Sequence, residues 1–126
     1  MSQTVPFESL KGKTFEKVTE DGYGVTLENK LERFELRHDQ ECCEAVYIED
    51  IAGELDDLVD SPILLAEETS DHGDQGQGSE TWTFYKLSTI KGSVTIRFYG
   101  TSNGFYSETA DLYRYEKSIL SDGDEV

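Results

Sequence analysis

The chain has 126 residues and carries 27 Asp and Glu against 11 Lys and Arg, a formal net charge of −16. This length suits one domain with its own core, and so strong a negative charge disfavours direct binding to nucleic acid or to anionic membranes. No apolar run approaches the roughly 18 residues of a membrane span, and the N-terminus lacks the features of a secretory signal. The two cysteines, Cys42 and Cys43, are adjacent, which favours a cytoplasmic, reduced protein over a disulfide scaffold.

The first forty residues show short alternating apolar patterns that are separated by turn residues. Three pairs of apolar residues mark three strands: Phe15 with Val18, Val25 with Leu27, and Phe34 with Leu36. Asp21-Gly22 indicates a hairpin between the first two strands, and Glu28-Asn29-Lys30 indicates the next turn. We therefore expect antiparallel neighbours in this region.

The middle of the chain combines one further strand with less regular segments. Residues 43–51 (CEAVYIEDI) alternate again and predict a strand. Leu55 and Leu58 lie at helical spacing in the acidic segment GELDDLVDS, which predicts one or two helical turns that end before Pro62. The apolar run PILLAEE predicts a buried strand. The segment Thr69–Glu80, rich in Gly, Asp, Ser and Gln, predicts a mobile acidic loop.

The C-terminal part carries the strongest strand signal. Thr81–Ser88, Ser93–Tyr99 and Tyr106–Tyr115 are dense in β-branched and aromatic residues, with turns at Lys91-Gly92 and Ser102-Asn103-Gly104. The chain is thus predicted to be mainly β, an antiparallel meander or a small barrel-like sheet with one short helix. Its single β-rich domain spans residues 1–116, and residues 117–126 form an acidic tail.

The segment around the cysteines raises the question of a metal or thiol site. His38, Cys42 and Cys43 offer three of the four ligands that zinc normally takes, and His72 offers a fourth. Adjacent side chains of a strand point to opposite faces, and the usual two-residue gap between paired cysteines is absent. Acidic surroundings also raise rather than lower a thiol pKa, which disfavours a catalytic cysteine with His38 as its base. We therefore expect no metal, cofactor or catalytic residue. The alternative is a metal or thiol site that uses His38, Cys42 and Cys43.

Acidic residues gather in the middle of the chain. The predicted acidic interaction surface consists of Glu49, Asp50, Glu54, Asp56 and Asp57, extended by Asp60, Glu67 and Glu68. Regularly spaced carboxylates imitate the phosphates of nucleic acid and so fit a basic groove on another protein. A solvated face that keeps the protein in solution is the simpler interpretation. Calcium is disfavoured because no twelve-residue calcium loop is present.

The C-terminal hairpins contain the parts of a small-ligand site. The candidate residues are Trp82, Phe84, Arg97, Tyr99, Asn103 and Tyr106. Aromatic rings stack on a base, an arginine pairs with phosphate or carboxylate, and an amide adds directional hydrogen bonds. The alternative is that the aromatics are core and sheet pairs and that Arg97 is an outward charge. The net charge opposes an anionic ligand unless Arg97, Lys86 or Arg114 reverses it locally.

Three segments, HDQECCEAVYIEDI, ILLAEE and TWTFYKLSTIKGSVTIRFYGTSNGFYSE, together resemble a family of small uncharacterised bacteriophage and prophage proteins. The resemblance runs from about Leu10 to Glu116, and its specific parts are the HDQ-x-CCE and SNG-x-YSE signatures. In the family pattern Phe98 is often Trp and Phe105 is often Tyr, both mild departures. The resemblance brings no catalytic residues. It implies an accessory phage protein that acts on the host by stoichiometric binding.

The leading hypothesis is therefore a non-enzymatic, phage-type binding protein that counters host defence. In one mechanism it sequesters a small nucleotide-like signal in the aromatic and arginine hairpins, between subunits of a homo-oligomer. In the alternative, its acidic surface inhibits a host nucleic-acid-binding enzyme by mimicking nucleic acid. A third class would be a metal- or thiol-dependent protein. The expected partner is a host defence protein or a small nucleotide in the host cytoplasm, with no direct binding to nucleic acid or membrane.

Overall fold

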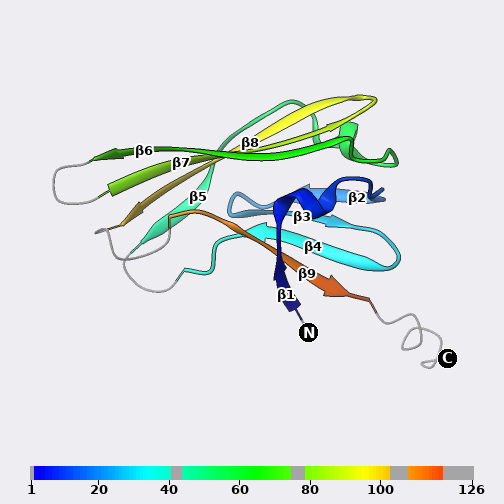
Figure 1. The fold of residues 1–126 in the computed structure, drawn as a ribbon, viewed down its shortest axis with the longest axis horizontal. Helices are drawn as coiled ribbons and strands as arrows, with labels where there is room; N and C mark the ends of the chain where they lie inside the picture. Colours follow the sequence, from blue (N-terminus) through cyan, green and yellow to red (C-terminus); the bar gives the residue numbers. More distant parts are fainter. Residues whose placement is uncertain (1, 41–43, 75–78, 103–107, 118–126) are drawn as a thin grey trace.

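The computed structural model describes residues 2–40, 44–74, 79–102 and 108–117. Two antiparallel sheets lie face to face with the core between them (Figure 1). The first sheet has the order β1-β9-β4-β3-β2, with β1 Ser2–Val5, β2 Lys17–Glu20, β3 Gly24–Glu28, β4 Glu32–Arg37 and β9 Asp111–Glu116. The second has the order β5-β8-β7-β6, with β5 Ala45–Ala52, β6 Leu65–Asp74, β7 Ser79–Thr89 and β8 Gly92–Ser102. Two 3₁₀ turns complete the described elements, η1 (Phe7–Leu10) and η2 (Leu55–Leu58).

Local turn chemistry builds the β2–β3–β4 part of the first sheet. The Asp21 carboxylate accepts hydrogen bonds from two backbone N–H groups, both at 2.9 Å, and Gly22 adopts a φ of 91°. Between β3 and β4, Asn29 Oδ1 likewise accepts two backbone N–H groups at 2.8 and 3.0 Å. Both turns predicted from the sequence are therefore confirmed.

The second sheet consists of a three-strand meander with a fourth strand at its side. β6, β7 and β8 follow one another through hairpins, and β5 pairs with the free side of β8. Along β7 and β8, buried residues alternate with more accessible ones, so each strand has one core face and one outer face. The register of β5 shifts between Ile48 and Asp50, and this bulge leaves both Glu49 and Asp50 exposed.

The core joins the two sheets through inward-facing side chains. Its largest fully buried aromatic residues are Tyr85, Phe15, Phe34 and Phe98. The ring of Tyr85 packs against Phe7 of η1 at a centroid distance of 5.0 Å and against Phe98 of β8 at 5.5 Å. Its hydroxyl group donates to the carbonyl oxygen of Ala110 at 3.0 Å, just before β9. Tyr85 thus connects β7 to the segment that leads into the other sheet.

The mainly β class is confirmed, while two details of the predicted arrangement are wrong. The sheets do not close into a barrel. The predicted meander is interrupted, because the strand after β8 is β9, which lies between β1 and β4 in the other sheet. The predicted one or two helical turns before Pro62 are found as the single 3₁₀ turn η2, where only Leu58 is buried and Glu54 makes no side-chain capping bond. Four residues with one buried anchor provide too little burial for a longer helix.

The segment Thr69–Glu80, predicted as a loop, is mostly strand. β6 continues to Asp74 and β7 begins at Ser79, and residues 75–78 lie outside the described residues. Thr69 is registered opposite Phe84, so a strong β-forming strand supplies the ladder for a segment of low local propensity. The strand predicted over PILLAEE begins only at Leu65. In the described part of the chain, no helix is long and apolar enough to cross a membrane.

Candidate functional site

The outer face of the second sheet gathers most of the predicted ligand-binding residues. On β7 the alternation turns Trp82 and Phe84 outward, and on β8 it turns Arg97 and Tyr99 outward. Trp82 is registered opposite Tyr99, and Phe84 opposite Arg97. Four of the six predicted residues therefore share one face. Asn103 and Tyr106 lie outside the described residues.

Four aromatic side chains on this outer face form what we call the aromatic face, made of Tyr47, Trp82, Phe84 and Tyr99. Tyr99 stands between two of them, with ring centroids 5.8 Å from Tyr47 and 5.3 Å from Trp82. Its hydroxyl group donates to Glu80 Oε1 at 2.7 Å. Tyr47 is 38% exposed and the other three are partly exposed. Grouped aromatic rings that remain accessible to solvent are typical of binding surfaces.

Arg97 joins the aromatic face to the predicted acidic surface. Its Nε lies 2.8 Å from Glu49 Oε1 on β5, and the two side chains are 40% and 35% exposed. The N–H group is not aligned for a hydrogen bond, so the contact is an ion pair only. Asp50, registered opposite Arg97, adds a second carboxylate on the same side. The positive charge of Arg97 is thus already balanced within the protein.

Of the remaining acidic candidates, Glu67 and Glu68 lie on β6, and the others lie around η2. Glu54 and Asp56 line an open groove of about 310 Å³ together with Glu20, and its apolar lining is supplied by Ile51 and Leu55. This acidic groove begins where β5 ends, and no Lys or Arg is among its described lining residues. Asp57 instead packs against the β7–β8 turn, where a Cβ added to Gly92 would lie 2.6 Å from Asp57 Oδ2. The five residues of the predicted acidic interaction surface therefore form two exposed parts, Glu49 with Asp50 and Glu54 with Asp56, and one packed residue, Asp57.

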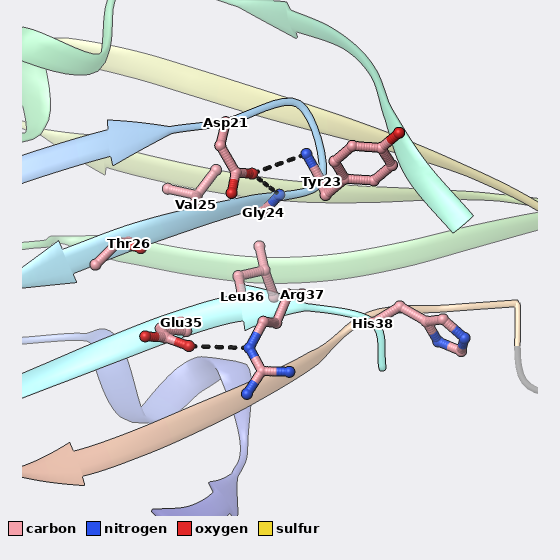
Figure 2. Close-up of a pocket in the computed structure, with 9 residues that line it drawn as sticks. All are labelled: Asp21, Tyr23, Gly24, Val25, Thr26, Glu35, Leu36, Arg37 and His38. Carbon is pink, nitrogen blue, oxygen red and sulfur yellow. Dashed lines mark hydrogen bonds and ion pairs between the residues drawn. The ribbon is translucent and has the colours of Figure 1, made fainter. Parts of the chain in front are cut away.

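A smaller pocket of about 190 Å³ lies at the β3–β4 end of the first sheet (Figure 2). Asp21, Tyr23, Glu35 and Arg37 contribute polar groups to it. Asp21 is occupied by backbone N–H groups, and Glu35 Oε1 accepts from Arg37 Nε at 2.9 Å. Arg37 Nη2 also donates to the hydroxyl oxygen of Tyr115 at 2.8 Å. These charged groups are engaged within the protein, which makes the pocket a weaker candidate for a charged ligand.

His38, the candidate metal ligand or base, also lines this pocket but has both ring nitrogens engaged. Nδ1 lies 2.9 Å from the carbonyl oxygen of Thr109, and Nε2 lies 2.8 Å from Glu44 Oε2. The His38 side chain is only 5% exposed. Cys42 and Cys43 lie outside the described residues. His38 therefore has a structural partner on each side of its ring.

A buried carboxylate, which sequence reasoning missed, lies where β7 and β8 meet the segment before β9. Glu108 accepts hydrogen bonds from the hydroxyl groups of Ser79, Thr81 and Ser102, and His72 Nδ1 lies 3.0 Å from Thr81 Oγ1. Burial alone would raise the pKa of Glu108, but the hydroxyl donors and then the nearby imidazole outweigh it and lower that pKa. A carboxylate with a lowered pKa is a weak general base at neutral pH. In the sequence, Ser79 and Thr81 lie two residues apart and so on one strand face, and this pattern could have indicated the hydroxyl cluster.

Replacing Glu108 by Gln is expected to lower the free energy of unfolding by about 1–3 kcal/mol at pH 7, because hydrogen bonds to a buried charged group are lost. The folded pKa lies below the unfolded value, so this contribution is fully present above about pH 4.3 and disappears as pH falls through the folded pKa. Urea unfolding of both proteins from pH 7 to pH 3 measures the difference. A difference that does not change with pH would contradict the assignment.

Charge is paired very differently in the two sheets. Residues 45–102, which contain the second sheet and η2, hold eleven Asp and Glu but only three cations, Lys86, Lys91 and Arg97. Of the eight ion pairs between described residues, seven lie outside this segment and the eighth is Arg97 with Glu49. Negative charge with few cations nearby is therefore concentrated around the aromatic face and the acidic groove.

Comparison with known proteins gives one match. No curated protein and no solved structure matches the chain. A family model described as a domain of unknown function, DUF7448, matches residues 8–112, which is most of the region where the sequence resembles an uncharacterised family. The match brings no assigned site or activity, so the candidate site rests on the geometry above. The chain belongs to the DUF7448 family.

Proposed function

We propose that this chain is a non-enzymatic binding protein that docks a basic surface of a partner protein against its aromatic face and acidic groove. The observation that supports this is the excess of acidic residues beside accessible aromatic rings. Carboxylates pair with Lys and Arg, and Trp and Tyr rings attract the same cations through their π faces. The surface thus has two kinds of group that favour one partner chemistry.

The class of partner follows from the charge and from the resemblance to phage accessory proteins. A protein that normally holds nucleic acid has a basic groove, and carboxylates can take the place of phosphates there. Phage accessory proteins act on the host. A host nucleic-acid-binding protein, including one used in defence, is therefore the partner class that we propose.

Sequestration of a nucleotide-like signal remains the competing mechanism. The rings of Trp82 and Tyr99 would suit a base, but a phosphate would have to compete with Glu49 for Arg97. It would also approach Asp50 and the other acids of this sheet. Electrostatic repulsion disfavours that approach. The geometry supports a basic protein better than an anionic small molecule.

Trp82→Ala is expected to weaken partner binding by about 2 kcal/mol or more, roughly thirtyfold, as for a central aromatic anchor. Asp50→Asn and Asp56→Asn are expected to weaken it less, and to reduce its dependence on salt. Immobilised wild-type chain captures basic proteins from a bacterial lysate, and a captured protein is then purified and titrated against each variant. Binding should fall between about 0.1 and 1 M salt, as the Debye length shortens from about 10 to about 3 Å.

Two matched controls locate the effect. Tyr23→Ala removes an aromatic ring that is 67% exposed at the β2–β3 turn, and Glu16→Gln removes an exposed acid beside the first sheet. Both should bind as the wild type does. Loss of binding in Tyr23→Ala but not in Trp82→Ala would move the working site to the β3–β4 pocket. A nucleotide that binds the wild type and not Arg97→Ala would overturn the protein-partner proposal.

A further inference from the structure

β6 is the longest edge strand of the two sheets among the described residues, and of the two 3₁₀ turns η1 contacts it. It is the last strand in the order β5-β8-β7-β6, and it runs for ten residues with only β7 paired to it. The edge strands of the other sheet, β1 and β2, have four residues each. The opposite edge, β5, is partly covered, since Ile48 N–H donates to the carbonyl oxygen of Gly22 at 2.9 Å. An edge strand presents alternate N–H and C=O groups that can pair with another chain.

The side chains of β6 determine which chain can pair there. Residues 67–72 are all exposed, and the strand contains several acids but no Lys or Arg. Burial, and then the nearby carboxylates of Glu8 and Asp111, raise the pKa of Glu68, so two further acids lie near this strand. Two copies that paired edge to edge would bring like charges together, which opposes self-association. A basic strand would meet opposite charges.

The edge of β6 also adjoins the aromatic face. Asp71 is registered opposite Trp82, and Glu67 opposite Lys86. A strand added beside β6 would place every second side chain on the same outer side as Glu67 and Asp71. These side chains would lie two strands from Trp82. An added strand and the aromatic face would therefore form one continuous surface.

We propose that β6 accepts an extended segment of the partner as an additional strand, and that this segment carries Lys or Arg at every second position. Backbone hydrogen bonds would hold the segment, and the carboxylates of Glu67 and Asp71 would select the basic side chains. This inference rests on the proposed function, from which it takes the positive charge of the partner. It adds the place and the mode of contact.

The test uses an eight-residue peptide of alternating Lys and Val as the probe, with the full chain in about 0.15 M salt. We expect hydrogen exchange to slow at least tenfold at alternate amides of β6 when the peptide is present. Glu67→Gln with Asp71→Asn should weaken binding, while Glu16→Gln should not. The same peptide with N-methylated backbone amides keeps its charges but cannot form the ladder, so it should give no protection.

The outcomes separate the two proposals. Protection of β6 by the peptide, lost on N-methylation, supports strand addition. Binding that changes the signals of Trp82 and Tyr99 while β6 exchanges as it does without peptide would overturn strand addition and leave the docking face standing. Equal binding of the N-methylated peptide would overturn it as well. If neither the peptide nor any basic protein binds, the proposed function fails together with the inference.

Discussion

Replacing Glu44 by Ala is expected to lower the free energy of unfolding by about 2–3 kcal/mol, because a buried ring nitrogen of His38 loses its hydrogen-bonding partner. The side chains of Glu44 and His38 are 0% and 5% exposed, and Glu44 Oε2 lies 2.8 Å from His38 Nε2. The other ring nitrogen faces the carbonyl oxygen of Thr109 at 2.9 Å. Urea unfolding at pH 7 measures the loss.

Glu44→Gln is the matched control for this prediction. Its amide N–H can donate to His38 Nε2, while Nδ1–H keeps its bond to Thr109, so the expected loss is about 1 kcal/mol or less. The two contacts join the segment after β4 to Glu44, just before β5, and to Thr109, in the segment before β9. A loss below about 1 kcal/mol in Glu44→Ala would show that the contact between Glu44 and His38 does not stabilise the connection between these segments.

Tyr85→Ala is expected to lower the free energy of unfolding by more, about 3–5 kcal/mol, because a large aromatic ring is removed from the centre of the core. Tyr85 is 1% exposed and its ring contacts Phe7 and Phe98. No neighbouring strand can move to fill the space without breaking its own ladder. The midpoint of urea unfolding should fall, while the circular dichroism spectrum of the folded protein should stay that of a β protein.

Tyr85→Phe separates the hydroxyl group from the ring. It keeps the packing but leaves the buried carbonyl oxygen of Ala110 without this donor, for an expected loss of about 1–3 kcal/mol. Burial, and then the carboxylate of Glu68, raise the pKa of Tyr85 far above its usual value. The hydroxyl group of the folded protein therefore stays protonated in mild alkali, and the loss should be equal at pH 7 and pH 9, both below the unfolded pKa of about 10. A loss that vanishes by pH 9 would contradict this.

The parts of the fold that depend on residues close together in the sequence were predictable. The Asp21-Gly22 and Asn29 turns carry their own hydrogen-bonding chemistry, so the β2–β3–β4 hairpins followed from the sequence. The alternation along β7 and β8 is a property of the sequence alone, and it places Trp82, Phe84, Arg97 and Tyr99 on a single face. Period-two patterns determine faces because side chains alternate in every strand.

The parts that depend on distant pairing were not predictable. Nothing near β9 indicates that it leaves the meander and enters the other sheet. Thr69 and its neighbours form a strand only because β7 lies beside them. The ion pair of Glu49 with Arg97 likewise needs β5 to be next to β8 and needs the bulge after Ile48. Strand order arises from tertiary packing, which a single sequence does not reveal.

The position of β9 also has a consequence for how the chain is made. β1 pairs only with β9 among the described strands. Residues 2–5 therefore cannot form their strand pairing until residues 112–115 have been synthesised. During translation, every strand of the second sheet leaves the ribosome earlier and can pair first. Closing a loop of this length costs entropy before any contact is gained, which slows folding. We expect the first sheet to be completed only after synthesis has passed residue 116, as the last step of folding.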